Sequence, residues 1–343
     1  MKKKSMGMVL IVVGMISLFW AGQVMGQEVI RWKMQGFMPS TANFHKFLQE
    51  YCDKVKKETN GRLEIQLFPG DALFPNLQVF KNIKAGVAEM AHTTTLYYQG
   101  MNENLVTQYP PFGLKGWEAP YFLWYYGGWK EILDPFYEEH GLLTAARINL
   151  GDEPIFSRVP IRSINDFKGL KIRMSGAAAR FFKNKLGAAT TLIGPAELYT
   201  ALKLGTVDAC EYTGGSMDYS LGIHEVTKYI IYPTYMGAGT VEFLINKNAY
   251  NKLPEDVRRI FDLCNTWAEV HITMKTYQDN QLALKKMVKE GGMQVIWLPK
   301  EDVAKMQKLA VEFWQEDLGA ISPTAKKLMD LYMDAARERG IIE

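Results

Sequence analysis

The chain has 343 residues, 48% of them hydrophobic, which is enough to fill the cores of two domains. Its 40 basic and 37 acidic residues leave a formal net charge of +3, and Lys2, Lys3 and Lys4 account for that surplus. Because the rest of the chain carries no excess positive charge, the composition excludes the basic surface with which proteins bind nucleic acids.

Residues 1–26 have the layout of a secretory signal peptide. The three lysines precede an apolar stretch at residues 8–21, and small or uncharged residues follow it. We expect cleavage after Gly26, which leaves Gln27 as the first residue of a secreted, periplasmic protein. The alternative is a retained membrane anchor, and it is disfavoured because the apolar stretch is shorter than the roughly 20 residues that span a bilayer.

The three cysteines, Cys52, Cys210 and Cys264, match no metal-binding or redox motif. In an oxidising compartment at most one pair of them can form a disulfide. We therefore expect them to act as small buried hydrophobic residues.

After the signal peptide, the spacing of apolar residues alternates between that of strands and that of helices. Residues 29–34 are predicted to form a strand, and the helix that follows is closed by Asn60-Gly61. Residues 63–67 alternate apolar and polar side chains, as a strand does. A second helix at residues 75–85 leads to a strand at residues 87–92. This order of elements predicts an α/β lobe with mostly parallel strands.

The unit of helix, glycine and strand occurs twice. Residues 77–92 align without gaps on residues 196–211, with matching apolar positions and a glycine after each helix. The repeat predicts two lobes of similar winding. Since parallel strands in open α/β sheets direct their carboxyl ends at a ligand crevice, we expect His92 and Glu211 to meet at one cleft. The alternative for His92 is a histidine buried in the core.

Residues 166–176 give the strongest local indication of a binding site. Apolar side chains at alternate positions share one face of a short strand, and a helix is predicted at residues 177–186 directly after it. Arg173 therefore lies near the carboxyl end of a strand and beside a helix amino terminus, whose free N–H groups favour anions. Its guanidinium can hold a carboxylate through two parallel hydrogen bonds. The alternative is a surface arginine paired with a nearby acid.

Several segments resemble those of a known family, the substrate-binding subunits of TRAP (tripartite ATP-independent periplasmic) transporters. The segments that are similar to its signature sequences are residues 90–100, 166–173 and 194–211. The branch that binds 2-oxo and 2-hydroxy monocarboxylates is resembled by residues 90–100, 111–114, 124–128 and 211–221. The likeness runs in order along nearly the whole mature chain, so it is more specific than any single motif.

The resemblance implies an α/β, two-lobe periplasmic binding protein fold, with a ligand cleft between the lobes and a long helix, within residues 255–289, that spans both. The implied divisions are lobe I at residues 27–150 and 238–277, lobe II at 151–237 and 278–320, and a C-terminal helix at 321–343. In some relatives such a helix is exchanged between the chains of a homodimer, and the alternative is that it docks on its own lobe. The implied partners are a small organic acid and the membrane permease of the transporter.

The resemblance also assigns roles to individual residues. In that family the matching arginine holds the ligand carboxylate, and this position is Arg173 here. Glu211 and Tyr212, after the second strand of the repeat, match a further contact, while Tyr97 and Tyr98 match the aromatic loop that lines the pocket. The predicted substrate-binding set is completed by Glu153, Tyr235 and His92.

Two departures from the family pattern bear on the ligand and on a cation. Many sugar-acid-binding relatives carry a second arginine where this chain has Asp152 and Glu153, and these acids should repel a second carboxylate. This argues against dicarboxylates and sialic acid. The oxo-acid branch also holds a cation with a glutamate where this chain has Gly237. We therefore expect no cofactor, unless Asp152, Glu153 and Glu211 converge as oxygen donors for a sodium or calcium ion.

Two other functions fit the sequence less well. A periplasmic hydrolase would use Asp152, Glu153 and Glu211 as acid and base, yet the chain has none of the GxSxG, HExxH or P-loop motifs. A ligand-sensing binding protein would use the same two lobes, and a neighbouring pair of transporter genes would distinguish it from a transport protein. The sequence thus favours a non-enzymatic binding protein for a small organic acid.

Overall fold

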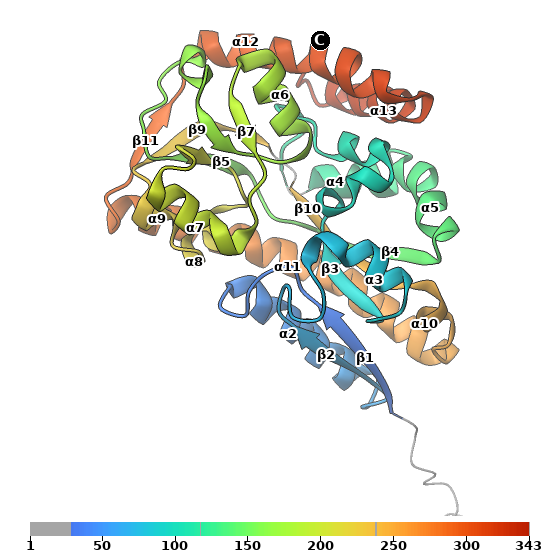
Figure 1. The fold of residues 1–343 in the computed structure, drawn as a ribbon. Helices are drawn as coiled ribbons and strands as arrows, with labels where there is room; N and C mark the ends of the chain where they lie inside the picture. The colour runs from blue at the N-terminus through green and yellow to red at the C-terminus, as the bar shows by residue number, and fades with distance from the viewer. Residues whose placement is uncertain (1–28, 117, 237–238, 343) are drawn as a thin grey trace, which may run out of the picture.

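Two β-sheets form the framework of the computed structural model, which describes residues 29–116, 118–236 and 239–342 (Figure 1). The predicted signal peptide, residues 1–26, lies outside the described residues. In the described part of the chain, one sheet has the strand order β2-β1-β3-β10-β4 and the other the order β11-β9-β5-β8-β6-β7. The strands of the first sheet are β1 (Ile30–Gln35), β2 (Leu63–Phe68), β3 (Met90–Thr93), β4 (Leu142–Asn149) and β10 (Thr240–Asn246). Those of the second are β5 (Glu153–Ser157), β6 (Lys171–Arg173), β7 (Ala189–Thr191), β8 (Ala209–Cys210), β9 (Tyr229–Met236) and β11 (Gln294–Trp297).

The predicted internal repeat is confirmed in the order of the strands. In the first sheet β2, β1 and β3 run parallel and β10 follows antiparallel to β3. In the second sheet β7, β6 and β8 run parallel and β5 follows antiparallel to β8. The helices of the repeat, α3 (Val79–Lys84) and α7 (Pro195–Leu204), are followed by Gly86 and Gly205, whose φ angles of +73° and +75° favour glycine.

The strands that begin at the crossings between the sheets make both sheets mixed, whereas the sequence predicted mostly parallel strands. The chain leaves the first sheet after Asn149 and enters the second at Glu153, and it returns to the first sheet at Thr240. A strand that starts at the cleft runs away from it, against strands that end there, so β5 and β10 are antiparallel to their neighbours β8 and β3. The exact lobe boundaries stay a prediction.

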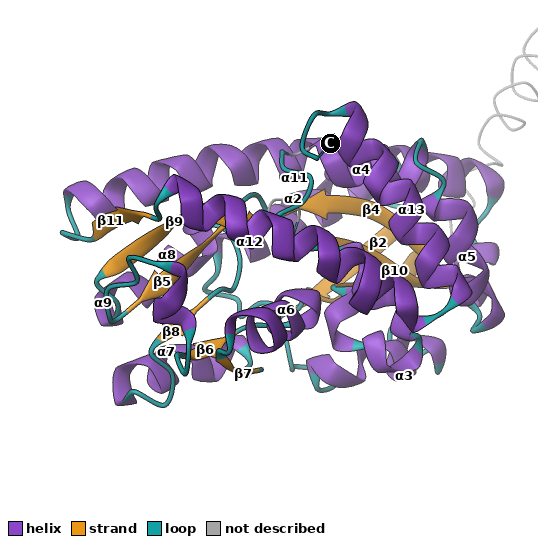
Figure 2. Cartoon of the chain, turned by 90° about the horizontal axis from the view of Figure 1, so that it is seen from above, coloured by secondary structure: helices purple, strands orange, loops and turns teal. Residues whose placement is uncertain are grey.

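The long helix α11 (Glu255–Lys289) has the bounds that the sequence predicted. It contacts α2 (Asn43–Glu58) and β4 of the first lobe and α8 (Gly215–Ser220) of the second, and it runs along both sheets in Figure 2. The other helices are α4 (Glu118–Tyr125), α5 (Trp129–Glu139), α6 (Gly176–Leu186), α9 (Ile223–Val226), α10 (Lys247–Asn251), α12 (Lys300–Phe313) and α13 (Pro323–Glu338). None of the helices in the described ranges is both long and apolar enough to cross a membrane.

The cysteines and the apolar face of the C-terminal helix are packed in the interior of the protein. Cys52, Cys210 and Cys264 are buried, as predicted, and none of the three is in a disulfide. The apolar face of α13 packs against its own chain, where the hydroxyl of Tyr332 accepts a hydrogen bond of 2.7 Å from the backbone N–H of Leu114. A Cβ atom at Gly113 would lie 1.7 Å from that hydroxyl, so only glycine leaves room for this contact.

Changing Tyr332 tests how firmly α13 is docked. Tyr332→Phe keeps the ring but leaves the buried N–H of Leu114 unpaired, and it should lower the free energy of unfolding by about 1–3 kcal/mol. Tyr332→Ala also removes the ring and should lower it by about 3–5 kcal/mol. Urea denaturation measures both. Wild-type stability in Tyr332→Phe would show that the hydrogen bond does not hold the helix.

Candidate ligand-binding site

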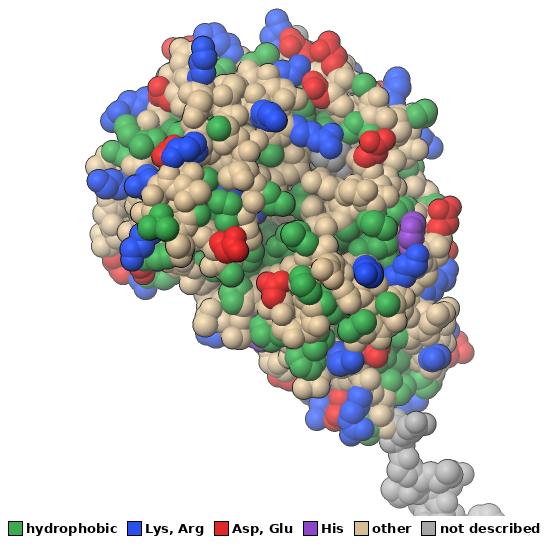
Figure 3. Space-filling view, viewed as in Figure 1, with side chains coloured by type: hydrophobic (Ala, Val, Ile, Leu, Met, Phe, Trp, Pro, Cys, Tyr) green, Lys and Arg blue, Asp and Glu red, His purple; other side chains and the backbone are tan. Residues whose placement is uncertain are grey.

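A cavity of about 40 Å³ lies between the two lobes, where strands of both sheets end. Its walls come from the carboxyl ends of β6 and β8, the amino end of β5, and the two crossings next to Leu150 and Gly239. The molecular surface is hollowed between the two halves in Figure 3, with hydrophobic side chains around the hollow. The cavity lining includes five of the predicted residues, Tyr97, Glu153, Arg173, Glu211 and Tyr212.

Arg173 is buried in the wall of this cavity, with 4% of its surface exposed. Its Nε atom donates to the carbonyl oxygen of Ile193 at 3.2 Å, and Nη1 donates to the carbonyl oxygen of Glu211 at 2.5 Å. Nη1 also lies 3.4 Å from Oε2 of Glu211, and the guanidinium carbon lies 4.8 Å from the ring centroid of Tyr212. Burial lowers the pKa of Arg173, but the neighbouring acidic groups, Glu211 first among them, together outweigh burial and raise this pKa. The guanidinium is therefore fixed and charged.

Three carboxyl groups, those of Glu153, Glu211 and Asp218, are buried beside this single guanidinium. Burial, followed by the charge of Glu211, raises the pKa of Glu153 well above its usual range. The same two causes raise the pKa of Asp218 to about 8, although the hydroxyl of Thr213 donates to its Oδ2 at 3.3 Å. Oε2 of Glu153 and Oδ1 of Asp218 have no hydrogen-bond partner among the described residues. The site thus has more acidic groups than one arginine can neutralise.

The approach of Glu153 to the cavity depends on a glycine in the second crossing. A Cβ atom on Gly239 would lie 1.8 Å from Oε1 of Glu153. The sequence signal for this contact is the pair of glycines at positions 237 and 239, of which Gly237 lies outside the described residues. The position at which the family pattern has a cation-binding glutamate is therefore not among the described residues.

Much of the remaining wall of the cavity is aromatic or apolar. The rings of Tyr97 and Phe37 meet edge to face, with centroids 6.3 Å apart, and the hydroxyl of Tyr212 lies 3.1 Å from the sulfur of Met38. Burial raises the pKa of Tyr97 to about 12, while the charge of Arg173 opposes this shift. Apolar surface is also provided by Leu96, Leu150, Leu192 and Val241. The cavity thus combines one cationic end with an apolar cover.

His92 lies in the core of the first lobe and is 1% exposed. Its ring stacks on Phe44, with centroids 4.8 Å apart, and also contacts Phe37 and Phe243. Burial lowers its pKa to about 3, so the imidazole is neutral. This is the alternative that the sequence left open. The cleft is instead reached by Thr94, which lies two residues further along the chain.

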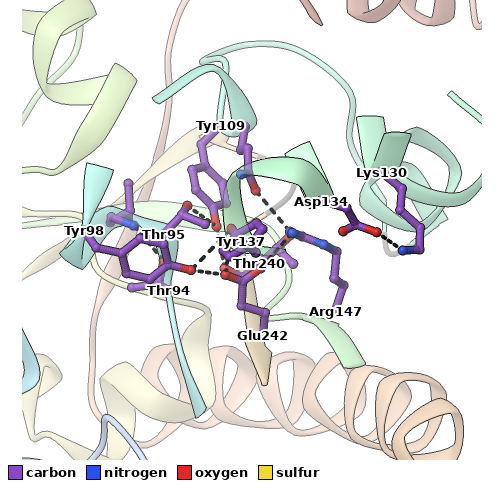
Figure 4. Close-up of polar contacts among 12 residues, drawn as sticks. Thr94, Thr95, Tyr98, Tyr109, Lys130, Asp134, Tyr137, Arg147, Thr240 and Glu242 are labelled. Atoms are coloured by element: carbon purple, nitrogen blue, oxygen red, sulfur yellow. Dashed lines mark hydrogen bonds and ion pairs between the residues drawn. The ribbon is translucent and has the colours of Figure 1, made fainter. Parts of the chain in front are cut away.

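Tyr98 and Tyr235 are buried behind the cavity wall rather than in its lining. The hydroxyl of Tyr98 donates to the carboxylate of Glu242, to which Tyr137 also donates at 3.1 Å (Figure 4). Tyr235 packs its ring against Phe182, with centroids 5.0 Å apart. Its pKa is raised by burial and then by the charges of Glu211 and Glu153, so it lies close to both carboxyl groups.

Glu242 belongs to a second buried ion pair that supports the first-lobe wall. Nη2 of Arg147 lies 2.7 Å from Oε2 of Glu242, and the guanidinium lies 3.3 Å above the ring of Trp124. Tyr109 lines the cavity, and its hydroxyl donates at 2.7 Å to the carbonyl oxygen of Thr240, two residues before Glu242 on β10 (Figure 4). The sequence reasoning missed Tyr109, since no strand or helix pattern placed it at the cleft.

The three predicted metal-ligand candidates do not converge into a group. Glu153 and Glu211 line the cavity, whereas Asp152 is not among its described lining residues. Within residues 29–116, 118–236 and 239–342, no three His, Cys, Asp or Glu side chains are arranged to hold a metal ion. A cation at this site would therefore need oxygen atoms from other groups to complete its ligands.

The model of family 7 of the bacterial extracellular solute-binding proteins matches residues 34–318. The chain belongs to this family. Its members are the solute-binding proteins of TRAP transporters, which are not enzymes, so the hydrolase alternative is excluded. The predicted family and fold are confirmed.

Individual relatives cover most of this family 7 chain. A monocarboxylate 2-oxoacid-binding periplasmic protein of Nostoc is 29% identical over 297 residues, which are 85% of this chain and 80% of the relative. A TRAP solute-binding protein of Pseudoalteromonas atlantica, solved with sodium and pyruvate, superposes with a TM-score of 0.82 at 26% identity, covering 91% of this chain and 95% of that one. A Bordetella bronchiseptica dimer, solved with calcium and picolinate, has a TM-score of 0.82 at 27% identity and covers 91% and 94%.

The raised pKa of Asp218 predicts how stability depends on pH in the family 7 protein. An acid whose pKa is higher in the folded chain than its ordinary 3.8 binds its proton more tightly when folded. Its stabilising contribution is therefore lost as the pH rises from about 4 through about 8. Asp218→Asn keeps the shape without a charge, so its melting temperature should fall less between pH 5 and pH 8 and exceed that of the wild type by about 2 °C or more at pH 8. Parallel melting curves for the two proteins would contradict this prediction.

Proposed function

We propose that this TRAP solute-binding protein captures a short 2-oxo or 2-hydroxy monocarboxylate in the periplasm and delivers it to a membrane permease. The observation that carries the proposal is the guanidinium of Arg173, which is buried in a cavity of about 40 Å³ between the lobes. A small anion that enters this cavity meets a fixed positive charge on one side and tyrosine rings on the other. The Nostoc and Pseudoalteromonas relatives, named for 2-oxoacids and solved with pyruvate, support this ligand class.

The residues around the cavity divide the work of binding. Arg173 holds the carboxylate through its planar fork of N–H groups, while Tyr97 and Tyr212 cover the apolar part of the ligand. Glu153 and Glu211 lie beside the guanidinium and face the 2-oxo or 2-hydroxy group. Three further predicted residues act from behind the wall. Tyr235 lies next to the carboxyl groups, and Tyr98 and His92 lie in the core of the first lobe. The acids in place of a second arginine disfavour dicarboxylates.

We further propose that a cation enters the site together with the acid. A carboxylate ligand would add negative charge to a cavity whose one guanidinium is already paired with the carboxylate of Glu211. Carboxylate oxygens suit hard cations, and Oε2 of the buried Glu153 has no hydrogen-bond partner among the described residues. Glu153 and Glu211 would hold the ion, and oxygens of the ligand would complete its shell. When bound, it would supply positive charge and fix the orientation of the acid.

Replacing Arg173 is the test of the proposed function. Arg173→Ala should weaken pyruvate binding by about 2–5 kcal/mol, because a buried carboxylate loses its charged partner. Arg173→Lys keeps the positive charge but lacks the fork of N–H groups, so its pyruvate affinity should lie between those of the wild type and Arg173→Ala. Isothermal titration calorimetry with pyruvate and calcium measures the affinities, and Arg180→Ala, an exposed arginine on α6, serves as the matched control. An Arg173→Ala affinity within threefold of the wild type would refute the assignment.

Removing divalent cations tests the charge argument separately. Chelation with EDTA in sodium-free buffer should weaken pyruvate binding roughly tenfold or more, because an uncompensated buried charge destabilises the complex. Glu153→Gln keeps nearly the same shape but removes the carboxylate that would hold the ion, so the difference between the chelated and the calcium-loaded samples should shrink. Equal pyruvate affinity of the wild type with and without cations would rule out the cation.

Localisation and assembly follow from the same proposal. Cleavage of the predicted signal peptide, residues 1–26, would leave Gln27 as the first residue of the mature protein, and mass spectrometry of the exported chain checks this. The homodimer through residues 321–343 stays a prediction, which the mass from light scattering can test. The dimer of the Bordetella relative supports it.

A further inference from the structure

Asn280, on the long helix α11, makes hydrogen bonds to two segments that belong to different parts of the fold. Its side chain is buried, with 4% exposed. Nδ2 donates to the carbonyl oxygen of Leu150 at 2.8 Å. Oδ1 accepts from the backbone N–H of Ser216 at 2.9 Å and from the Ser216 hydroxyl at 2.7 Å. One amide group therefore connects α11 to two segments, the crossing at Leu150 and the start of α8.

Both segments lead directly to the ligand cavity. Leu150 lines the cavity and lies in the crossing from β4 to β5, three residues before Glu153. Ser216 lies in the first turn of α8, directly after the stretch from Glu211 to Thr213 that forms the opposite part of the wall. The hydrogen bonds of Asn280 thus fix the backbone on both sides of the carboxyl groups that surround Arg173.

Glycines in these two segments make room for the side chain of Asn280. A Cβ atom on Gly214 would lie 2.0 Å from Nδ2 of Asn280, and one on Gly151 would lie 2.6 Å from it. Gly214 has a φ of −95°, which any residue adopts, so space alone requires a glycine there. Close packing on both sides therefore leaves the amide group a single position.

A second contact on the same face of α11 holds the first loop again. The hydroxyl of Thr273, two helical turns before Asn280, accepts a hydrogen bond of 3.0 Å from the backbone N–H of Asn149. The crossing at residues 149–151 is therefore tied to the helix at two points. The start of α8, at Ser216, is held to α11 by the side chain of Asn280.

We propose that Asn280 is a positioning residue that fixes both sides of the ligand cavity to α11, so that Glu153 and Glu211 keep their places beside Arg173. The role rests on the proposed function, since it concerns the same cavity. It assigns to the helix a contact that ligand affinity depends on, although Asn280 is not among the residues that line the cavity.

Hydrogen exchange of the ligand-free protein tests the proposal without any ligand. Asn280→Ala should speed amide exchange at residues 149–153 and 213–217. Asn280→Asp keeps an acceptor for Ser216 but loses the donor to Leu150, so it should speed exchange at residues 149–153 and leave the Ser216 amide protected. The matched control is Asn265→Ala, because Asn265 is also 4% exposed on α11 and accepts a 2.7 Å hydrogen bond from Tyr51 in the first lobe.

Pyruvate titration in the presence of calcium gives the second readout. Asn280→Ala should weaken binding roughly tenfold, whereas Asn265→Ala, at similar loss of melting temperature, should change it less than threefold. Exchange at residues 149–153 and 213–217 that matches the Asn265→Ala control would overturn the proposal, and so would unchanged pyruvate affinity. If the wild type binds no pyruvate or other 2-oxo acid, the proposed function fails, and the exchange data still decide the role of Asn280.

Discussion

The imbalance between one buried guanidinium and three buried carboxyl groups is the constraint on which the rest of the site depends. Arg173 is paired with Glu211, while Glu153 and Asp218 are held close to both with strongly raised pKa values. Burial strengthens every one of these interactions, because the interior screens charge poorly. A site of this kind interacts strongly with any small charged ligand, and its charge balance determines which ligand binds stably there.

The fold places this cluster through the geometry of its crossings. Strands that end at the cleft deliver Arg173 and Glu211, and a strand that begins at the cleft delivers Glu153 from the opposite direction. Antiparallel pairing of β5 with β8 therefore brings the two glutamates together. The long helix α11 lies along both lobes and holds the crossings by side-chain hydrogen bonds from Thr273 and Asn280. Ligand binding and the connection between the lobes thus share the same few residues.

Much of this could be predicted from the sequence, and the failures have physical reasons. The helical spacing of apolar residues without glycine or proline predicts the bounds of α11, and the repeat predicts two lobes of similar winding, which the strand orders of the two sheets confirm. Arg173 was found because a short strand, a turn and a helix follow one another locally. The sequence predicts His92 at the cleft, but this residue lies before the end of β3, where its ring packs against Phe44 and Phe243 in the core. Asp218 and Tyr109 were missed, since they reach the site through packing of distant segments that no local pattern records.

The most direct measurement is a crystal structure of the mature protein grown with pyruvate and calcium. The account predicts that both carboxylate oxygens of the ligand lie within hydrogen-bonding distance of the Arg173 guanidinium, with the cation beside Glu153 and Glu211. A ligand bound elsewhere, with Arg173 still paired only to Glu211, would contradict it.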